Sequence, residues 1–110
     1  MDKKVIIEDN ISFRKFFNKN ENFKTKVLEN IYLELPEIIK YKPHKIKTAY
    51  NFKYHNKTIY EYKIILDAYT NCRVAFIYEE DTLLVFFISN IIIKREFVKL
   101  LSKFSGVTHS

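Results

Sequence analysis

The sequence predicts one α+β domain: a small antiparallel sheet, made of an opening strand and a three-strand meander, packs against an N-terminal helical pair and precedes a C-terminal helix. Three observations support this fold class. Apolar residues recur at helical spacing in the first half of the chain, runs rich in Ile, Val, Tyr and Phe follow, and the links between those runs are short. The length of 110 residues fits a single unit, residues 1–110.

The first half is expected to hold a strand and two helices. Lys3–Ile7 is rich in β-branched residues and stops at a polar stretch, which predicts a short strand. Ser12 suits the N-cap of a first helix, in which phenylalanines recur at helical spacing. Asn22 suits the N-cap of a second helix. Pro36 is expected to kink or restart that helix, because proline lacks an amide proton and clashes with the preceding turn.

Three strands and a last helix are expected in the second half. The strands are Ile59–Leu66, Arg73–Tyr78 and Leu83–Ser89, and short polar segments separate them. Such short links require antiparallel neighbours, because a parallel crossover needs about a dozen residues or more. Apolar residues return to helical spacing over Lys94–Phe104, which predicts the C-terminal helix.

The net charge of +6 comes from one segment. Residues 1–39 hold seven Lys or Arg and seven Asp or Glu, and residues 64–110 hold five of each. Residues 40–63 hold seven lysines against Glu61 alone, so this segment carries the whole excess. It is a candidate surface for a polyanion such as RNA, and the alternative is a solvated lysine-rich loop. The candidate RNA-binding residues are Lys45, Lys47, Lys53, His55, Lys57 and Lys94.

Several kinds of site are not expected. The single glycine, Gly106, cannot build a nucleotide-binding loop, so we expect no nucleotide cofactor. The histidines have no metal-ligand spacing and Cys72 is the single cysteine, so we expect neither a metal site nor an internal disulfide. The apolar runs are far shorter than the roughly 20 residues that cross a bilayer, and residues 1–8 lack the apolar stretch of a secretory signal. We therefore expect a cytoplasmic protein that does not contact membranes.

Four cations could meet on one face of the predicted sheet. Lys63 lies in the first strand of the meander, Arg73 opens the next, and Lys94 and Arg95 follow the third. Fixed Lys and Arg side chains could hold a backbone phosphate and stabilise the charge that builds as a ribose 2′-hydroxyl attacks it. The alternative is that these are ordinary exposed cations. Arg73 is expected to be a surface residue whose replacement leaves the protein folded.

Four short motifs follow one another in the second half of the chain. They are a Tyr-Lys-Ile strand (Tyr62–Ile64), an arginine that opens the next strand (Arg73–Phe76), a strand that ends in Ile-Ser (Leu84–Ser89) and a Lys-Arg-Glu segment (Lys94–Glu96). In this order and at nearly this spacing, they resemble the RelE-type toxins of the RelE/ParE family. The resemblance covers somewhat less than half of the chain, at its C-terminal end, and the first half agrees in pattern alone.

That resemblance implies an α+β fold of the kind predicted above and a function. RelE toxins belong to type II toxin–antitoxin systems and cut mRNA on the ribosome without a metal. They use 2′-hydroxyl attack, which leaves a cyclic phosphate and a 5′-hydroxyl. By resemblance, Lys63 and Arg73 would be catalytic residues that orient and stabilise the phosphate, and Arg95 would act as a second cation. The implied partners are mRNA on the ribosome and a cognate antitoxin that is acidic or partly disordered.

The chain departs from the family pattern at two positions and in one link, because Asn90–Ile93 makes the link before Lys94 about two residues longer. The family's second strand lysine falls on Ile65, and its tyrosine after the Lys-Arg-Glu segment falls near Leu101. No general acid or base is therefore identified. The substitutes that we consider are Tyr62, Tyr69, His55 and Lys57.

Two alternatives to a ribonuclease stay open. One keeps the fold without the chemistry, as a ParE-like inhibitor of DNA gyrase or as a nucleic-acid-binding or protein-binding module. The other is an unrelated small nucleic-acid-binding or interaction protein. A further expectation concerns the link before the last helix, Asn90–Ile93, which holds three consecutive isoleucines that are hard to bury together. Because exposed apolar patches mark interaction sites, we expect a partner to cover this link or the adjacent helix.

Overall fold

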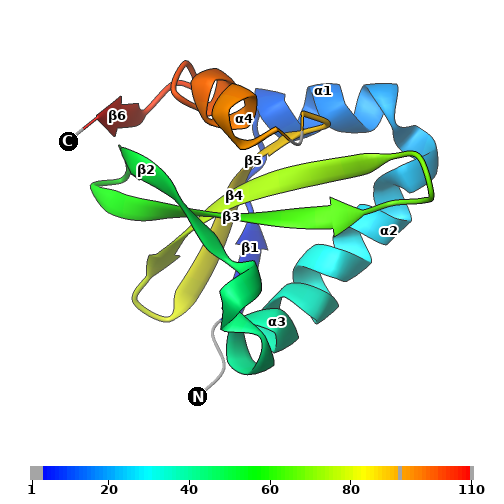
Figure 1. Cartoon of the computed structure of the whole chain (residues 1–110), viewed down its shortest axis with the longest axis horizontal. Coiled ribbons are helices and arrows are strands. Elements are labelled where there is room, and N and C mark those ends of the chain that lie inside the picture. The colour runs from blue at the N-terminus through cyan, green and yellow to red at the C-terminus, as the bar shows by residue number, and fades with distance from the viewer. Residues whose placement is uncertain (1–3, 92, 110) are drawn as a thin grey trace.

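A six-stranded mixed sheet lies at the centre of the computed structural model, which describes residues 4–91 and 93–109 (Figure 1). The strand order is β1-β5-β4-β3-β2-β6. The strands are β1 (Lys4–Ile7), β2 (Lys47–Tyr54), β3 (Lys57–Ile65), β4 (Asn71–Glu79), β5 (Thr82–Ser89) and β6 (Val107–His109). The α+β class is confirmed, but the sheet is larger than the four strands that the sequence predicts.

The pairing of β1 corrects the expectation of a purely antiparallel sheet. β1 runs parallel to β5, with Val5 opposite Leu83, whereas all other neighbours are antiparallel. Helices and three strands separate β1 from β5 in the chain, so the long connection that a parallel pairing needs is present. Lys3, the first residue of the predicted strand, lies outside the described residues.

β2 and β6 are strands that the sequence did not predict. β2 lies inside the lysine-rich segment, and of its eight residues only Ala49 and Tyr54 are buried. Such a strand lacks the alternation of apolar and polar residues by which strands are found in a sequence. β6 is three residues long and pairs with β2 from Phe52 to Tyr54. The middle of the lysine-rich segment therefore forms a β-hairpin with β3, and not a loop.

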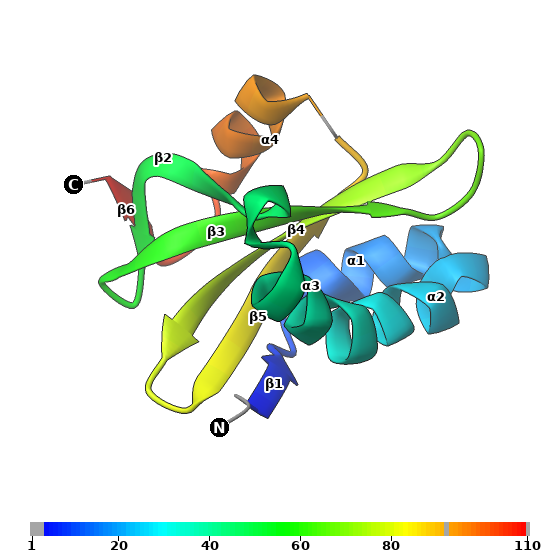
Figure 2. The same cartoon turned by 60° about the horizontal axis from the view of Figure 1, so that its bottom comes forward.

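Helices cover both faces of the sheet. α1 (Ile11–Lys19), α2 (Lys24–Glu29) and α3 (Leu35–Tyr41) lie on one face, and α4 (Lys94–Leu101) lies on the other (Figure 2). α4 ends earlier than the predicted helix, and the chain then turns into β6. None of the helices in the described part of the chain combines the length and the apolar character that crossing a bilayer requires.

α1 begins earlier than expected because Asn10, and not Ser12, caps it. The Phe13 amide donates a hydrogen bond to the Asn10 side chain at 3.2 Å. The Ser12 hydroxyl instead accepts from the Ile88 amide at 3.0 Å and donates to the Ile88 carbonyl at 3.2 Å. Ser12 thus satisfies the backbone amide and carbonyl of Ile88, which lie beyond the end of β1 on the edge of β5, and it joins α1 to the sheet.

The second predicted helix is one continuous helical segment with changes of pitch. It opens with a 3₁₀ turn (Glu21–Phe23), and no side-chain hydrogen bond caps this turn, so the cap expected at Asn22 is wrong. A π-helical turn (Asn30–Glu34) separates α2 from α3. Pro36 lies in the first turn of α3. The helix restarts there as expected, because the wider π turn accommodates a residue without an amide proton.

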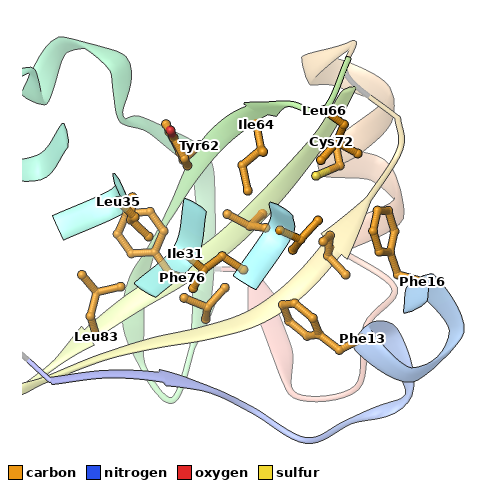
Figure 3. Packing of buried hydrophobic residues seen from close by; sticks show 14 residues of the cluster. Phe13, Phe16, Ile31, Leu35, Tyr62, Ile64, Leu66, Cys72, Phe76 and Leu83 are labelled. Atoms are coloured by element: carbon orange, nitrogen blue, oxygen red, sulfur yellow. The ribbon is translucent and has the colours of Figure 1, made fainter. Parts of the chain in front are cut away.

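The hydrophobic core has two parts, one on each face of the sheet. On the first face, Ile31 and Leu35 of the helical segment pack against Ile64 and Phe76 of the strands (Figure 3). The second part lies under α4, where the helix residues are Phe97, Val98 and Leu101, and the buried strand residues are Ala49, Tyr54, Ile59, Ala75, Ile77, Phe86 and Phe87. Side chains alternate between the two faces along the regular parts of the strands, whereas an irregularity in β5 places both Phe86 and Phe87 under α4. Both faces of the sheet are therefore largely covered, and its solvent-exposed parts lie toward the ends of the strands.

The link before α4 is partly exposed. Ile91 and Ile93 are 40% and 65% exposed, and Ile92 lies outside the described residues. Exposed isoleucines at these two positions are compatible with a partner that covers the link. That partner stays a prediction.

Candidate functional site

Four cations gather on the α4 face of the sheet, toward the end of β3 that leads into β4. Lys63 of β3 lies directly opposite Arg73 of β4. Directly paired residues of antiparallel strands share a face, so both side chains lie on the same side of the sheet. Lys47 pairs with Glu61 in the next row, and Lys94 reaches Glu61 from α4. We call Lys47, Lys63, Arg73 and Lys94, together with the enclosed Glu61, the cationic face.

A buried ion pair anchors the cationic face. Arg73 donates a hydrogen bond from its guanidinium to Glu61 Oε1, and the side chains of the two residues are 14% and 1% exposed. The guanidinium also lies over the ring of Phe97 of α4, 5.7 Å from the ring centroid. Arg73 is therefore not the surface cation that the sequence predicts. It forms part of the packing between the sheet and α4.

Lys94 joins α4 to β2. Its Nζ donates a hydrogen bond to the backbone carbonyl of Thr48 at 2.8 Å and lies 3.9 Å from Glu61 Oε1. It also lies 5.1 Å from the centroid of the Tyr50 ring. These contacts hold Lys94 in place and also tie α4 to Thr48 and Tyr50 of β2.

Glu61 is the one buried charged residue among those that the structure describes. Burial raises the pKa of its carboxyl group, and this effect exceeds the lowering by Arg73 and by Lys94. Its second oxygen, Oε2, is buried and has no hydrogen-bond partner among the described residues. Because the carboxyl group is enclosed, it cannot contact a substrate directly, and its effect on this face is to hold the two cations in place.

A pH dependence of stability follows from the raised pKa of Glu61. The carboxyl group binds its proton more tightly in the folded state than in the unfolded state. Its contribution to stability is therefore fully present below its ordinary pKa of 4.5 and is lost as the pH rises through the raised pKa. We expect the wild type to gain stability relative to Glu61→Gln, which cannot titrate, as the pH falls from neutral to 4.5. Urea unfolding measures this difference, and a relative loss over that range would show that Arg73 outweighs burial.

Apart from Lys94, which lies in α4, the predicted RNA-binding residues are divided between the two ends of the β2–β3 hairpin (Figure 1). Lys45 and Lys47 lie at the open end, where Lys45 and Lys63 line one surface pocket. The turn end holds the other three predicted RNA-binding residues of the lysine-rich segment, which are Lys53, His55 and Lys57. From Lys57 to Lys63 the extended chain covers about 20 Å. The five residues therefore do not form one continuous surface.

Acidic residues balance the charge at the turn end of the hairpin. His55 Nδ1 lies 2.5 Å from Glu79 Oε1. Lys57 lines a surface hollow together with Glu79, Glu80 and Asp81 of the β4–β5 turn. The positive charge of the lysine-rich segment that acidic residues do not balance thus lies at the open end of the hairpin, at the cationic face.

The structure also places Arg95, Ile65 and Leu101, and of these three only Arg95 differs from expectation. Lys94, rather than Arg95, is the cation of α4 that lies beside Glu61, and Arg95 is exposed. Consecutive helix residues point about 100° apart, so the two side chains leave α4 in different directions. Ile65 shares the face of Lys63 and is 63% exposed, whereas Leu101 is fully buried under α4. Neither position supplies the missing lysine or tyrosine.

The candidates for proton transfer are scattered. Tyr62 is buried in the core on the α1–α3 side, where burial raises the pKa of its hydroxyl group. His55 and Lys57 lie at the turn end of the hairpin. Tyr69 lies in the β3–β4 turn and is 96% exposed. Of these four, Tyr62 and Tyr69 belong to the end of β3 that carries Lys63, and Tyr62 lines the same surface pocket as Lys45 and Lys63.

Glu61 and Tyr50 are the residues of this site that sequence reasoning missed. Glu61 carried a signal, because it is the lone acid among the seven lysines of residues 40–63. Such an acid inside an apolar run is a candidate partner for a buried cation. Tyr50 carried no comparable signal, since its place depends on the path of β2.

Comparison of the chain with protein-family models, with curated proteins and with solved structures finds no match. Within residues 4–91 and 93–109, no group of three or more His, Cys, Asp and Glu side chains is placed to hold a metal ion.

Proposed function

We propose that the protein is a RelE-type toxin of a type II toxin–antitoxin system that binds mRNA on the cationic face and cleaves it on the ribosome, in the cytoplasm. The observation that carries this proposal is the direct pairing of Lys63 with Arg73, with Lys94 held nearby by Glu61 and Thr48. Cations fixed in this way suit a backbone phosphate, because their charge needs no rearrangement when the phosphate arrives. The proposed protein partner is a cognate antitoxin.

Each cation has a distinct part in the proposed reaction. Lys63 is exposed and contacts a non-bridging oxygen of the scissile phosphate. Arg73 and Lys94 add positive charge behind it, while Arg95 contacts a neighbouring phosphate. The 2′-hydroxyl oxygen bonds to phosphorus and loses its proton, the bond to the 5′-oxygen breaks, and that oxygen gains a proton. The products are a cyclic phosphate and a 5′-hydroxyl.

Binding without cleavage is the second candidate, and the position of the acids and tyrosines favours it. Glu61 is 1% exposed, and Tyr62 is 8% exposed with a hydroxyl pKa that burial raises, so neither is poised to exchange a proton with RNA at neutral pH. A surface of cations holds a phosphate but offers no positioned general acid or base. Gyrase inhibition in the manner of ParE, or a nucleic-acid-binding or protein-binding module, belongs to this candidate.

Induced expression of the full chain in bacteria, with mapping of mRNA 5′ ends, separates the two candidates. We expect growth arrest and new 5′-hydroxyl ends for the wild type. Lys63→Ala should reduce cleavage roughly 100-fold, because removal of one charge stabiliser has an effect of that order. Lys57→Ala is the matched control, since both lysines are exposed on β3 and neither replacement should unfold the protein.

The outcomes are distinct. Arrest without new 5′ ends would move the function to binding. Cleavage that is unchanged in Lys63→Ala would show that the cationic face is not the site. If the wild type neither arrests growth nor binds RNA, the ribonuclease and the RNA-binding form of the second candidate are both wrong.

A further inference from the structure

Tyr50 lies in a large bulge of β2 beside the cationic face. Thr48 pairs with Tyr60 and Lys53 pairs with Thr58, so the four residues 49–52 lie opposite the single residue Ile59. Bulges of this kind redirect side chains and are common next to functional sites. The bulge turns the Tyr50 ring outward, where it is 56% exposed.

The backbone of Tyr50 is strained. Its φ angle is +50°, in the left-handed region that favours glycine. The other described non-glycine residues with positive φ are His55, Asn56 and Glu80, and all of these lie in turns between strands. Tyr50 alone among them lies inside a strand. An exposed ring gains little from burial, so packing does not account for a tyrosine at this position.

The surroundings of the ring indicate what it contacts. Lys94 Nζ lies 5.1 Å from the ring centroid, and the same amine lies 3.9 Å from Glu61 Oε1, at the centre of the cationic face. An exposed aromatic ring beside fixed cations is the arrangement by which proteins bind single-stranded nucleic acids: the bases stack on the ring while the cations hold the backbone. Bases inside a duplex are already stacked and cannot use such a ring.

We infer that Tyr50 is a stacking platform for an unpaired base of an RNA whose adjacent phosphate lies on Lys63 and Lys94. This inference rests on the proposed function and adds to it the class of ligand: the cationic face takes single-stranded RNA and not duplex RNA. Tyr50 contributes binding through its ring and takes no part in bond breaking.

Binding of three labelled probes to purified full-length protein tests this inference. The probes are a ten-nucleotide single-stranded RNA, the same strand with abasic residues, and a ten-base-pair RNA duplex. Tyr50→Ala should weaken binding of the single strand by about 5-fold to 150-fold, the range measured for loss of one base–aromatic stack. It should leave binding of the abasic strand and the duplex unchanged. Tyr50→Phe keeps the ring and should bind the single strand within about 3-fold of the wild type, a change too small for a lost stack.

Tyr41→Ala is the matched control. Tyr41 is 66% exposed and has a lysine, Lys40, with its Nζ 5.2 Å from the ring centroid, but it lies at the end of α3 on the other side of the sheet. We expect this variant to bind all three probes as the wild type does. A loss of single-strand affinity equal to that of Tyr50→Ala would overturn the inference.

Tyr50→Gly adds a readout that a purely structural tyrosine would not give. Glycine adopts a φ of +50° without strain, so the melting temperature should rise by a few degrees while single-strand affinity falls as in Tyr50→Ala. A melting temperature below that of Tyr50→Ala, which also lacks the ring, would show that the backbone is not strained at this position, and this support for the inference would be lost.

Failure of the inference differs from failure of the proposed function. If Lys63→Ala weakens RNA binding but Tyr50→Ala does not, the stacking platform is wrong and the cationic face stands. If Tyr50→Ala weakens binding of the abasic strand as much as that of the intact strand, Tyr50 acts only by positioning Lys94. If the wild type binds none of the probes, the inference is overturned, whereas the proposed function fails on its own test, when induced expression gives neither growth arrest nor new mRNA 5′ ends.

Discussion

Replacing Arg73 by alanine is expected to lower the free energy of unfolding by about 3–5 kcal/mol, because it leaves the Glu61 carboxylate buried without its partner. Glu61 is 1% exposed and Arg73 is 14% exposed, so in the wild type the guanidinium, rather than bulk water, compensates the charge of the carboxylate. The variant also loses the contact between the guanidinium and the Phe97 ring. Chemical denaturation at neutral pH measures the effect.

Two further variants make this test specific. Arg95→Ala removes an exposed arginine from the first turn of α4 and should change stability by less than about 0.5 kcal/mol. The double variant Glu61→Leu/Arg73→Met replaces both charges by apolar side chains and should recover most of the lost stability. Equal effects of Arg73→Ala and Arg95→Ala would show that the ion pair does not hold the sheet and α4 together.

The expected destabilisation by Arg73→Ala would also lower any activity of the protein. A loss of the proposed toxicity in Arg73→Ala would not by itself identify Arg73 as a catalytic residue, because unfolding at growth temperature has the same effect. Lys63 is exposed, so its replacement tests the cationic face without this complication.

Reversing the charge of two lysines at the open end of the hairpin is expected to have the largest effect on RNA binding. Lys47→Glu/Lys63→Glu should weaken binding of a short single-stranded RNA by roughly 100-fold. The slope of log affinity against log salt should become smaller by about 1.4, since each lost phosphate contact to a single strand accounts for about 0.7. Both residues belong to the cationic face. Titrations at several salt concentrations provide both quantities.

Lys53→Glu/Lys57→Glu is the matched control, with the same change in net charge. These two lysines lie at the turn end of the hairpin, about 20 Å from Lys63 along the strand. That distance exceeds the Debye length of about 8 Å at physiological salt, so charges there act only weakly on the cationic face. We expect RNA affinity within about 3-fold of the wild type. Equal effects of the two double variants would mean that net charge, and not the cationic face, determines binding.

The elements whose sequences carry a clear local period were predicted correctly. The strands β3, β4 and β5, the helices of the first half and α4 follow from apolar spacing and from links too short for parallel crossovers. The concentration of positive charge in residues 40–63 was also evident from the sequence alone. These properties depend on residues that are close together in the chain.

Features that depend on distant residues were decided by the tertiary structure. β2 was missed because most of its side chains are exposed, and the parallel pairing of β1 depends on the path of the whole helical segment. The pairing of Lys63 with Arg73 depends on the register between β3 and β4, which local sequence does not specify.

The tertiary structure also decides which residues meet on the cationic face. The sequence identified Lys63, Arg73 and the Lys94–Arg95 pair as candidate phosphate ligands. It could not show that Glu61 and Arg73 are buried as an ion pair, that α4 turns Lys94 toward Glu61, or that a bulge exposes Tyr50. Burial, helix rotation and bulge geometry arise only when the sheet and α4 pack together, because each is set by contacts between segments that are far apart in the chain.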